Sequence, residues 1–286
     1  MALIPEEIRE DQEKLHARPG QKLRILDVAR ISYEDYGSDT DQVPELQANI
    51  IANSVSGVKP VDWGVPATDE RIAVVGYGPS LAHSWEGLKD YKVIITTSKA
   101  HDFLVERGII PTIHIDVDYR SHKAKFLTKP QQGVKYWLNV ACSPEYIEKL
   151  RDYDLSLFQV KYNNPCEYPN DYPSIKTGLW DVGQFAVYIA KKIGYLKQDL
   201  YGFDYSHVFE GKFKTDMNSV VAHAGPHEGG RYPIMYVKAG ERMYETNHAL
   251  LSGCFVFEEF TRNNPDLDLQ IYSDALLLNF LEARYK

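Results

Sequence analysis

The residues best suited to chemistry follow a hydrophobic run: positions 74 to 81 read VVGYGPSL. Glycines let backbone N–H groups approach an anion, and Ser80 could add a hydroxyl or cap the next helix. The spacing begins like a dinucleotide fingerprint, but the third glycine is missing and no Gly-Lys-Ser/Thr follows as in a Walker loop. The turn predicts contact with a nucleotide phosphate through Gly76, Gly78, Pro79 and Ser80, and a purely structural turn is the alternative.

Two carboxylates end another apolar run, in IHIDVD. Asp116 and Asp118 point to opposite sides if the strand persists and converge only if it breaks there. Such a pair could hold Mg²⁺ or Mn²⁺ on a diphosphate, because hard cations prefer carboxylate oxygen. We therefore expect Asp116 at the nucleotide and both residues as candidate metal ligands. Capping of the following turn, or pairing with Arg120, is the structural alternative.

A third candidate group follows the strand in LYGFDYS. Gly202 allows close approach by a ligand, and Asp204 could bind a sugar or ribose hydroxyl or simply cap the loop. His223 and His227 lie in the irregular stretch that follows, with His207 before them. A histidine near neutrality is the usual general base for a hydroxyl nucleophile, so we predict catalytic roles among His223, His227 and Asp204.

The overall charge disfavours one class of partner, although it leaves room for a local basic groove. The chain of 286 residues has a formal net charge of -8, so no global field draws it onto nucleic acid or an anionic membrane. Local positive charge comes from Lys123, Lys125, Lys212, Lys214 and Arg231. These side chains could neutralise a diphosphate, and surface solvation explains them as well.

The elements that must position these residues are apolar β-type runs that alternate with helical patterns. This alternation predicts an α/β fold, a Rossmann-like, mostly parallel sheet with helices on both faces. In such a sheet, ligands bind at the carboxyl ends of the strands, where the strand order reverses. The predicted strands are 71–77, 91–98, 111–118, 135–140, 155–160, 198–204 and 267–273. Their ends carry the small, polar and acidic residues 76–80, 97–98, 116–118, Asn139, 202–204 and Ser273.

Helical spacing is clearest over residues 179–195, and Thr177 and Gly178 at its start offer a hydroxyl and a bare backbone. Residues 244–263 also read as helical. The Gly-, His- and Pro-rich stretch 206–240 is too long for an ordinary connection and predicts a lid.

The domain organisation follows from the apolar density along the chain. Residues 1–42 are charged and weakly patterned, so we interpret them as an N-terminal arm, which could be a dimer contact or an acceptor guide. Residues 43–286 would form the nucleotide-binding catalytic domain.

Targeting and cysteine patterns favour a cytoplasmic protein. No stretch approaches the roughly 20 apolar residues of a membrane span, and the N-terminus lacks the layout of a signal peptide. The three cysteines are widely spaced and form no C-x-x-C, so neither disulfides nor a zinc knuckle are expected.

In their order, these segments resemble the Maf-type proteins of flagellin glycosylation and their phage-encoded relatives. A related archaeal branch is similar to pterin pyrophosphokinases, and the bacterial sialyltransferases are more distant. The resemblance spans roughly residues 45–280. The segments that carry it are VVGYGPSL, IDVDYRSHKAKFL, YWLNVACSPEYIEKL, TGLWDVGQFAVYIAKKIGYLKQDLYGFDYS and YETNHALLSGCFVFEEF.

The resemblance implies roles for particular residues. In the sialyltransferase-like members the Gly-x-Gly-Pro-Ser turn lies against the nucleotide phosphates, and the position after the second strand, here Ser98, contacts the nucleotide. Thr177 and Gly178 match the Thr-Gly before the long helix. The catalytic histidine of those enzymes has no counterpart between residues 228 and 247, so His223 or His227 substitutes for it only by neighbourhood.

Three functions stay open at this point. The first is a glycosyltransferase that uses a nucleotide-sugar donor and a glycan, protein or modified DNA base as acceptor, with no membrane partner. The second is a Mg-dependent pyrophosphokinase acting on a small heterocycle such as a pterin. The third is a non-catalytic nucleotide-binding protein, and a homo-oligomer is compatible with all three.

Overall fold

An eight-stranded sheet forms the centre of the computed structural model, which describes residues 25–30, 43–64, 68–161, 166–175, 178–206, 221–222, 225–226 and 234–284. All of its strands run parallel, in the order β13-β8-β2-β3-β4-β5-β6-β7. The predicted Rossmann-like α/β fold is therefore confirmed. The strands are β2 (Thr68–Val75), β3 (Ile94–Thr97), β4 (Ile113–Asp116), β5 (Lys135–Asn139), β6 (Asp154–Val160), β7 (Ser174–Ile175), β8 (Tyr195–Tyr201) and β13 (Asp268–Tyr272).

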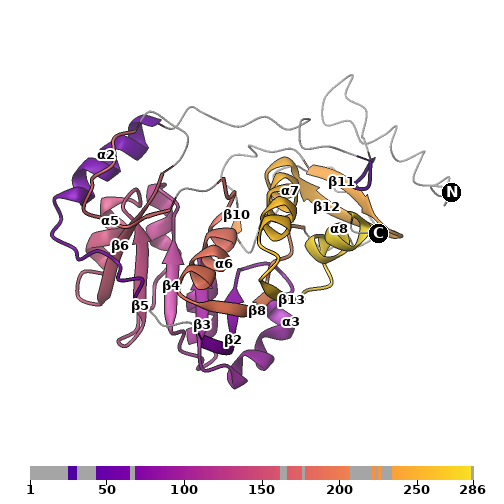
Figure 1. The fold of residues 1–286 in the computed structure, drawn as a ribbon, viewed down its shortest axis with the longest axis horizontal. Coiled ribbons are helices and arrows are strands. Elements are labelled where there is room, and N and C mark those ends of the chain that lie inside the picture. Colours follow the sequence, from indigo (N-terminus) through magenta and orange to yellow (C-terminus); the bar gives the residue numbers. More distant parts are fainter. Residues whose placement is uncertain are drawn as a thin grey trace.

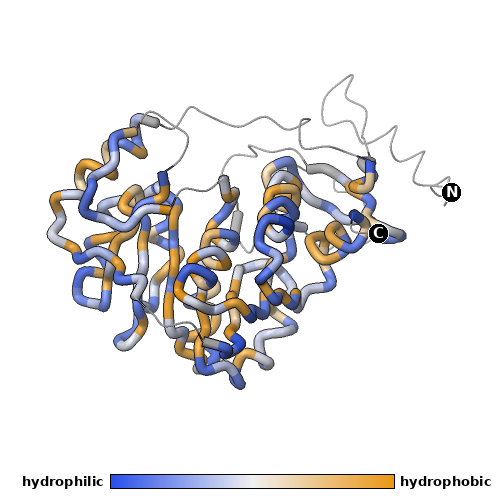
Figure 2. The backbone as a smooth tube through the Cα atoms, in the orientation of Figure 1, coloured by the Kyte–Doolittle hydropathy of each residue, from blue (hydrophilic) through white to orange (hydrophobic). Residues whose placement is uncertain are grey.

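The strands are continuous apolar runs because both faces of the sheet are covered. In β2, Ile72 and Val74 belong to the core on one face, whereas Ala73 and Val75 belong to the core on the other. Side chains alternate between the faces with a period of two, so a strand that is buried on both sides needs apolar residues at every position. Figure 2 shows apolar residues recurring along the central strands and along α6.

Helices cover both faces (Figure 1). One core contains side chains of α6 (Val182–Lys192), α7 (His248–Asn263) and α8 (Leu276–Arg284). The second core lies over β5 and β6 and uses α2 (Val43–Ser54), α5 (Pro144–Lys149) and the 3₁₀ helix η3 (Ser121–Lys125). The third lies on β2 and β3 and uses α3 (Leu81–Ser84), η2 (Trp85–Asp90) and α4 (Ala100–Val105).

A small three-stranded sheet lies beside α7 and α8 (Figure 1), where β1 (Ile25–Asp27) runs parallel to β11 (Ile234–Ala239) and β12 (Arg242–Asn247) runs antiparallel to it. Val28, which follows β1, is fully buried in the main core. Most of the expected arm 1–42 lies outside the described residues, so the boundary at 42 stays a prediction. Within the expected lid 206–240, the structure describes β9 (Val221–Ala222), β10 (Gly225–Pro226) and β11.

The strand order reverses between β2 and β8. From β2 the chain continues through β3, β4, β5, β6 and β7 on one side, and it then returns to β8 on the other side of β2. In open α/β sheets this reversal opens a crevice at the carboxyl ends of the two diverging strands. Residues 76–80 after β2 and 202–206 after β8 therefore lie at the position where this fold binds ligands.

Candidate functional site

Backbone N–H groups of the turn after β2 form hydrogen bonds to the end of β8. The N–H of Gly76 donates to the carbonyl oxygen of Tyr201 at 2.8 Å, and the N–H of Gly78 donates to that of Gly202 at 2.9 Å. The N–H of Ser80 donates to a carboxylate oxygen of Asp204 at 2.7 Å. Three of the four N–H groups in residues 76–80 are thus used inside the protein, since Pro79 has none.

The glycines are required by the close approach of these two turns. A Cβ on Gly78 would lie 2.5 Å from a carboxylate oxygen of Asp204, and one on Gly76 would lie 2.8 Å from the Gly202 carbonyl oxygen. Gly202 has φ +67, and a Cβ there would lie 2.5 Å from the Gly76 carbonyl oxygen. Packing alone therefore accounts for Gly76, Gly78 and Gly202, as the structural alternative held, and their contact with a nucleotide stays a prediction.

Asp204 holds the turn together. One carboxylate oxygen accepts from the Ser80 hydroxyl at 2.5 Å and from the Ser273 hydroxyl, while the other accepts from the Ser80 N–H. Asp204 is 2 % exposed, and Ser273 follows β13, so three neighbouring strand ends meet at this carboxylate. These bonds give Asp204 a positioning role, and the predicted catalytic role stays untested.

The end of β3 brings Ser98 beside this turn. The Thr97 hydroxyl donates to the Val75 carbonyl oxygen at 3.3 Å, which ties the ends of β3 and β2 together. Ser98 has φ 49, a left-handed backbone that is uncommon for residues other than glycine. Strained conformations of this kind cluster at ligand sites, so the geometry is compatible with the nucleotide contact expected for Ser98.

The acidic pair after β4 is divided between two environments. Asp118 accepts from Arg120 Nε at 2.8 Å and lies 3.1 Å from Lys123 Nζ. Burial alone would raise the pKa of Asp118, but the hydrogen bonds from Arg120 and the charge of Lys123 hold it well below its ordinary value. Asp116 is 1 % exposed, and burial raises its pKa to about 6.

This donor set does not fit a divalent cation. A metal site needs several oxygen ligands that converge on one point, and two cationic side chains already neutralise Asp118. Among the residues that the structure describes, no group of three or more His, Cys, Asp or Glu side chains could hold a metal ion. Arg120 pairs with Asp118, as the structural alternative held. The predicted metal binding by Asp116 and Asp118 therefore stays untested, and the cations at Asp118 argue against it.

The long helix predicted over 179–195 is α6, which spans Val182–Lys192. Its N-cap is Asp181, whose carboxylate accepts from the Gln184 N–H at 3.1 Å and from the Tyr205 hydroxyl at 2.5 Å. Gln184 Nε2 donates to the Gly253 carbonyl oxygen in α7 at 2.7 Å. This buried network fixes the first turn of α6 against the end of β8 and against α7.

Gly178 precedes this helix in an open position. It is exposed, and a Cβ there would meet no atom within 4 Å. Packing therefore does not require glycine at this position, unlike at Gly76, Gly78 and Gly202. Thr177, its neighbour, lies outside the described residues, so its expected nucleotide contact stays a prediction.

A substitution at Gly178 separates binding from folding. We expect Gly178→Ala to leave the melting temperature of the free protein unchanged, because the added methyl group meets nothing. If a ligand approaches this backbone, the same methyl group would weaken nucleotide binding, by roughly tenfold for a clash of about 1.4 kcal/mol. Calorimetric titration and thermal unfolding of the same sample measure both effects, and unchanged nucleotide affinity would remove Gly178 from the site.

The structure corrects the start of the helix predicted over 244–263. Residues Arg242–Asn247 form β12, paired with β11, and α7 begins at His248. The Asn247 side chain caps this helix by accepting from the Leu250 N–H at 3.0 Å. Antiparallel pairing with β11, across a turn of two residues at Gly240 and Glu241, overrides the apparent helical pattern.

This correction draws attention to His248, a histidine that the sequence analysis did not single out. The Thr246 hydroxyl donates to the Tyr205 carbonyl oxygen at 2.7 Å, so His248 follows closely on a contact with the end of β8. Partial burial lowers the pKa of His248. A lowered pKa favours the neutral imidazole, the form that accepts a proton. His223 and His227 lie outside the described residues, and their catalytic roles stay predictions.

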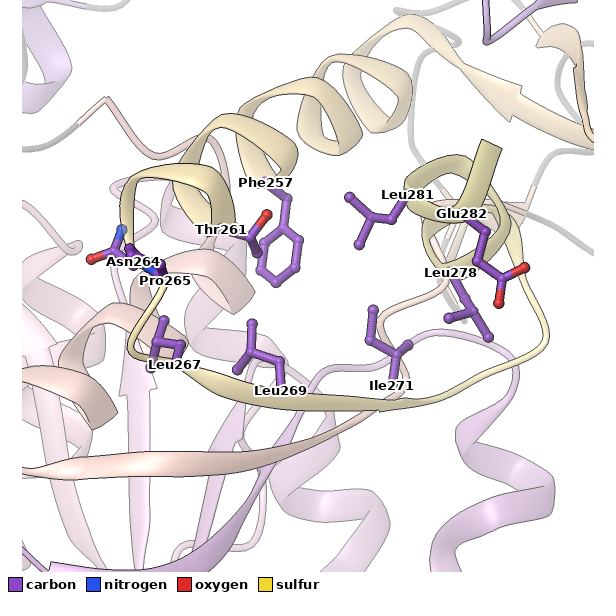
Figure 3. A pocket seen from close by; sticks show the side chains of 10 residues that line it. All are labelled: Phe257, Thr261, Asn264, Pro265, Leu267, Leu269, Ile271, Leu278, Leu281 and Glu282. Atoms are coloured by element: carbon purple, nitrogen blue, oxygen red, sulfur yellow. The ribbon is translucent and has the colours of Figure 1, made fainter. Parts of the chain in front are cut away.

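A cavity of ≈ 440 Å³ lies elsewhere, between α7, α8 and β13 (Figure 3). Its walls are mainly apolar, with Leu267, Leu269 and Ile271 on one side and Leu278 and Leu281 on the other. None of the candidate residues lines it. Its few polar groups do not converge as they do at a ligand site, so we place the candidate site at the carboxyl edge.

The fold and the site together define a Rossmann-like α/β protein. Polar residues at the ends of its strands lie close together where the strand order of the sheet reverses. The family model described as 6-hydroxymethylpterin diphosphokinase MptE-like matches residues 45–210. Because the match covers more than half of the chain, the chain belongs to the MptE-like family. A comparison with curated proteins finds no match.

Solved structures add a second likeness. The chain is similar to the Maf glycosyltransferase from Magnetospirillum magneticum AMB-1, with a TM-score of 0.62 and 15 % identity, over 84 % of this chain and 38 % of that one. A mammalian sialyltransferase matches with a TM-score of 0.34 and 13 % identity, over 86 % of this chain and 88 % of that one. The resemblance inferred from the sequence is confirmed. At this identity the Maf match shows a shared fold, and this chain spans well under half of that protein.

Proposed function

We propose that this chain is a glycosyltransferase that moves a sugar from a nucleotide-activated donor to an acceptor hydroxyl. The observation that carries this proposal is the meeting of the ends of β2, β8 and β13 at the Asp204 carboxylate, with the end of β3 hydrogen-bonded to β2, at the switch point of the sheet. Nucleotides bind at this position in α/β sheets. The shared fold with the Maf glycosyltransferase supports the same choice.

The charges at the site favour glycosyl transfer over a metal-dependent reaction. A nucleotidyl or pyrophosphoryl transfer needs divalent cations to neutralise the phosphates, and Asp118 is already paired with Arg120 and Lys123. Glycosyl transfer breaks a bond at the anomeric carbon instead. Cationic and hydroxyl side chains alone can stabilise its leaving phosphate.

His248 is the described residue best suited to act as the base. In the proposed reaction the acceptor oxygen attacks the anomeric carbon, and the bond from that carbon to the donor phosphate breaks. The electron pair of this bond leaves with the phosphate, and the acceptor proton passes to the neutral imidazole of His248. Exclusion of water from the site would protect the donor from hydrolysis.

The function is tested by incubating the protein with a panel of nucleotide-sugars and measuring release of the free nucleoside phosphate. We expect turnover of one donor, and His248→Gln should lower the rate by roughly 10²- to 10⁴-fold, the usual contribution of a general base. His83→Gln is the control, because His83 lies exposed on α3. No turnover of any nucleotide-sugar, with or without added acceptor, would contradict the proposal.

The class of acceptor and the other partners are also part of this proposal. A glycan, a protein or a modified DNA base each offers a hydroxyl for attack, and the excess of acidic residues disfavours DNA. Among the described residues, no helix has both the length and the apolarity needed to cross a bilayer. Cytoplasmic location and self-association are both compatible with this proposal.

A pyrophosphokinase is the second candidate, and the description of the family model favours it. Such an enzyme would use ATP and Mg²⁺ to transfer a pyrophosphoryl group to a small heterocycle such as a pterin. Formation of AMP from ATP, lost on chelation of Mg²⁺, would support this reaction. Bound nucleotide without turnover of any kind would support the third possibility, a non-catalytic nucleotide-binding protein.

A further inference from the structure

Helix α2 lies on the surface of the protein, yet it carries two buried asparagines. Asn49 is 8 % exposed and Asn53 is 2 % exposed, whereas Ile51 between them is 59 % exposed. The two asparagines are four residues apart, so they lie on the same face of the helix. A buried amide needs hydrogen-bond partners, because an unpaired polar group is costly in the interior. The partners of these two amides show what the inner face of α2 holds.

Each amide nitrogen donates to two backbone carbonyl oxygens. Asn49 Nδ2 donates to that of Tyr119 at 2.9 Å and to that of Ala141 at 3.0 Å. Asn53 Nδ2 donates to two carbonyl oxygens within residues 140–142, at 2.8 Å and 2.7 Å. An amide NH₂ group has two hydrogens, so each side chain uses both. Asn49 therefore joins the loop after β4 to the loop after β5, whereas Asn53 contacts only the loop after β5.

The loop after β4, residues 116–119, is named the acidic loop, and it is tied to other elements through its carbonyl oxygens. Its first carbonyl oxygen accepts from Cys142 Sγ at 3.5 Å, its second from Asn139 Nδ2 at 3.4 Å and its fourth from Asn49 Nδ2 at 2.9 Å. A thiol is a weak donor, and an N–H···O bond of 3.4 Å is long. Asn49 therefore supplies the strongest of the three ties.

These ties decide where the acidic loop lies at the carboxyl edge of the sheet. The N–H of Asp118 donates to the Asp116 carboxylate at 3.0 Å, and the N–H of Arg120 donates to the Asp118 carboxylate at 3.1 Å. Such local bonds fix the shape of the loop, but only bonds to other elements fix its position. The loop follows β4, which is the neighbour of β3 in the sheet. It therefore lies on the edge where ligands of this fold bind.

Helix α2 covers this edge beyond the acidic loop. In Figure 1 it lies beside α5, on the side of the molecule that contains β5 and β6. Asn139, at the end of β5, is fully buried, and its side-chain oxygen accepts from the N–H of Ala141 at 3.3 Å and of Val160 at 3.2 Å. The end of β5 thus does not face a ligand, and the acidic loop lies at the border of the covered part.

We propose that Asn49 is a positioning residue that holds the acidic loop where the nucleotide binds, and that α2 is the wall of the ligand site beyond β4. The inference deepens the proposed function and rests on its placement of the nucleotide at the carboxyl edge. Asn49 acts through the carbonyl oxygen of Tyr119 and does not touch the nucleotide. Its removal frees the acidic loop, whereas removal of Asn53 loosens the loop after β5 and leaves the tie to Tyr119 in place.

The test compares Asn49→Ala with Asn53→Ala, the matched control, which removes two hydrogen bonds of the same kind from the same helix. Hydrogen–deuterium exchange of the free protein reports on the acidic loop, and calorimetric titration with UDP, GDP, ADP, TDP and CMP reports on nucleotide binding. We expect similar melting temperatures for the two variants. Asn49→Ala alone should speed exchange of the Asp118 and Arg120 amides and raise the dissociation constant of the nucleotide about tenfold. Asn53→Ala should change that constant by less than about twofold.

Equal exchange rates or equal dissociation constants in the two variants would overturn the positioning role, and so would a failure of the unmodified protein to bind any of these nucleotides. If Asn49→Ala does not fold, Asn49→Ser decides, because the smaller side chain leaves room for a water to bridge the two carbonyl oxygens. Nucleotide binding that only the Asn49 variant weakens, without transfer of any sugar, would keep the positioning role and reject the glycosyltransferase. Sugar transfer with the same KM in both variants would do the reverse.

Discussion

Replacement of Gly202 by alanine is expected to destabilise the protein more than any other single methyl addition at the site. The residue has φ +67, and its Cβ would lie 2.5 Å from the Gly76 carbonyl oxygen, on backbone that cannot move without opening the turn after β2. Backbone strain of about 1–2 kcal/mol adds to this clash. We expect a total loss of roughly 3–5 kcal/mol in the free energy of unfolding. The melting temperature should then fall by on the order of 10 °C.

Gly108→Ala separates the two contributions. Gly108 has φ +77, close to that of Gly202, but a Cβ there would meet nothing within 4 Å. Its replacement should therefore cost only the backbone strain of about 1–2 kcal/mol. Thermal unfolding of both variants measures the difference. Equal losses at the two positions would contradict the close packing of the β2 and β8 turns.

Removal of the Asp204 carboxylate is expected to have the second large effect. Asp204→Ala leaves the Ser80 N–H and the hydroxyls of Ser80 and Ser273 without their acceptor. An unpaired buried polar group costs about 1–3 kcal/mol, although reorientation of the hydroxyls reduces the sum, so we expect a loss of roughly 3 kcal/mol. The turn would loosen, and nucleotide affinity would fall with it.

Asp204→Asn distinguishes positioning from catalysis. The amide can accept from the Ser80 N–H with its oxygen and donate to the two serine hydroxyls, so it should recover much of the stability and the binding lost in Asp204→Ala. Unfolding temperature and turnover are measured on both variants, with exposed Asp152→Asn as a control. A stable Asp204→Asn protein with turnover lowered by about 10²-fold or more would instead make Asp204 a catalytic acid or base.

The strands of the main sheet could be predicted from the sequence because each is an apolar run bounded by polar turns. All seven predicted runs coincide with strands, from β2 through β6 and in β8 and β13. The two residues of β7 were too short to stand out. The pairing of β1 with β11 joins segments more than 200 residues apart, and no local pattern contains that information.

The candidate site was predictable in position and less so in detail. The rule that ligands bind at strand ends selected the turn at 76–80, Asp204 and Ser273, which the structure brings together. The sequence could not show that β8 uses the N–H groups of Gly76 and Gly78, because that depends on the neighbour across the switch point.

A thermal-shift screen against nucleotide-sugars, free nucleotides and ATP, each with and without Mg²⁺, tests the central claim most directly. A ligand at 100 times its dissociation constant stabilises the folded state by about 2.7 kcal/mol, which is readily measured. The account predicts stabilisation by one nucleotide-sugar and by its nucleoside phosphate, to the same extent in EDTA and in Mg²⁺. Stabilisation by ATP alone, and only when Mg²⁺ is present, would contradict it and assign the chain to pyrophosphoryl transfer.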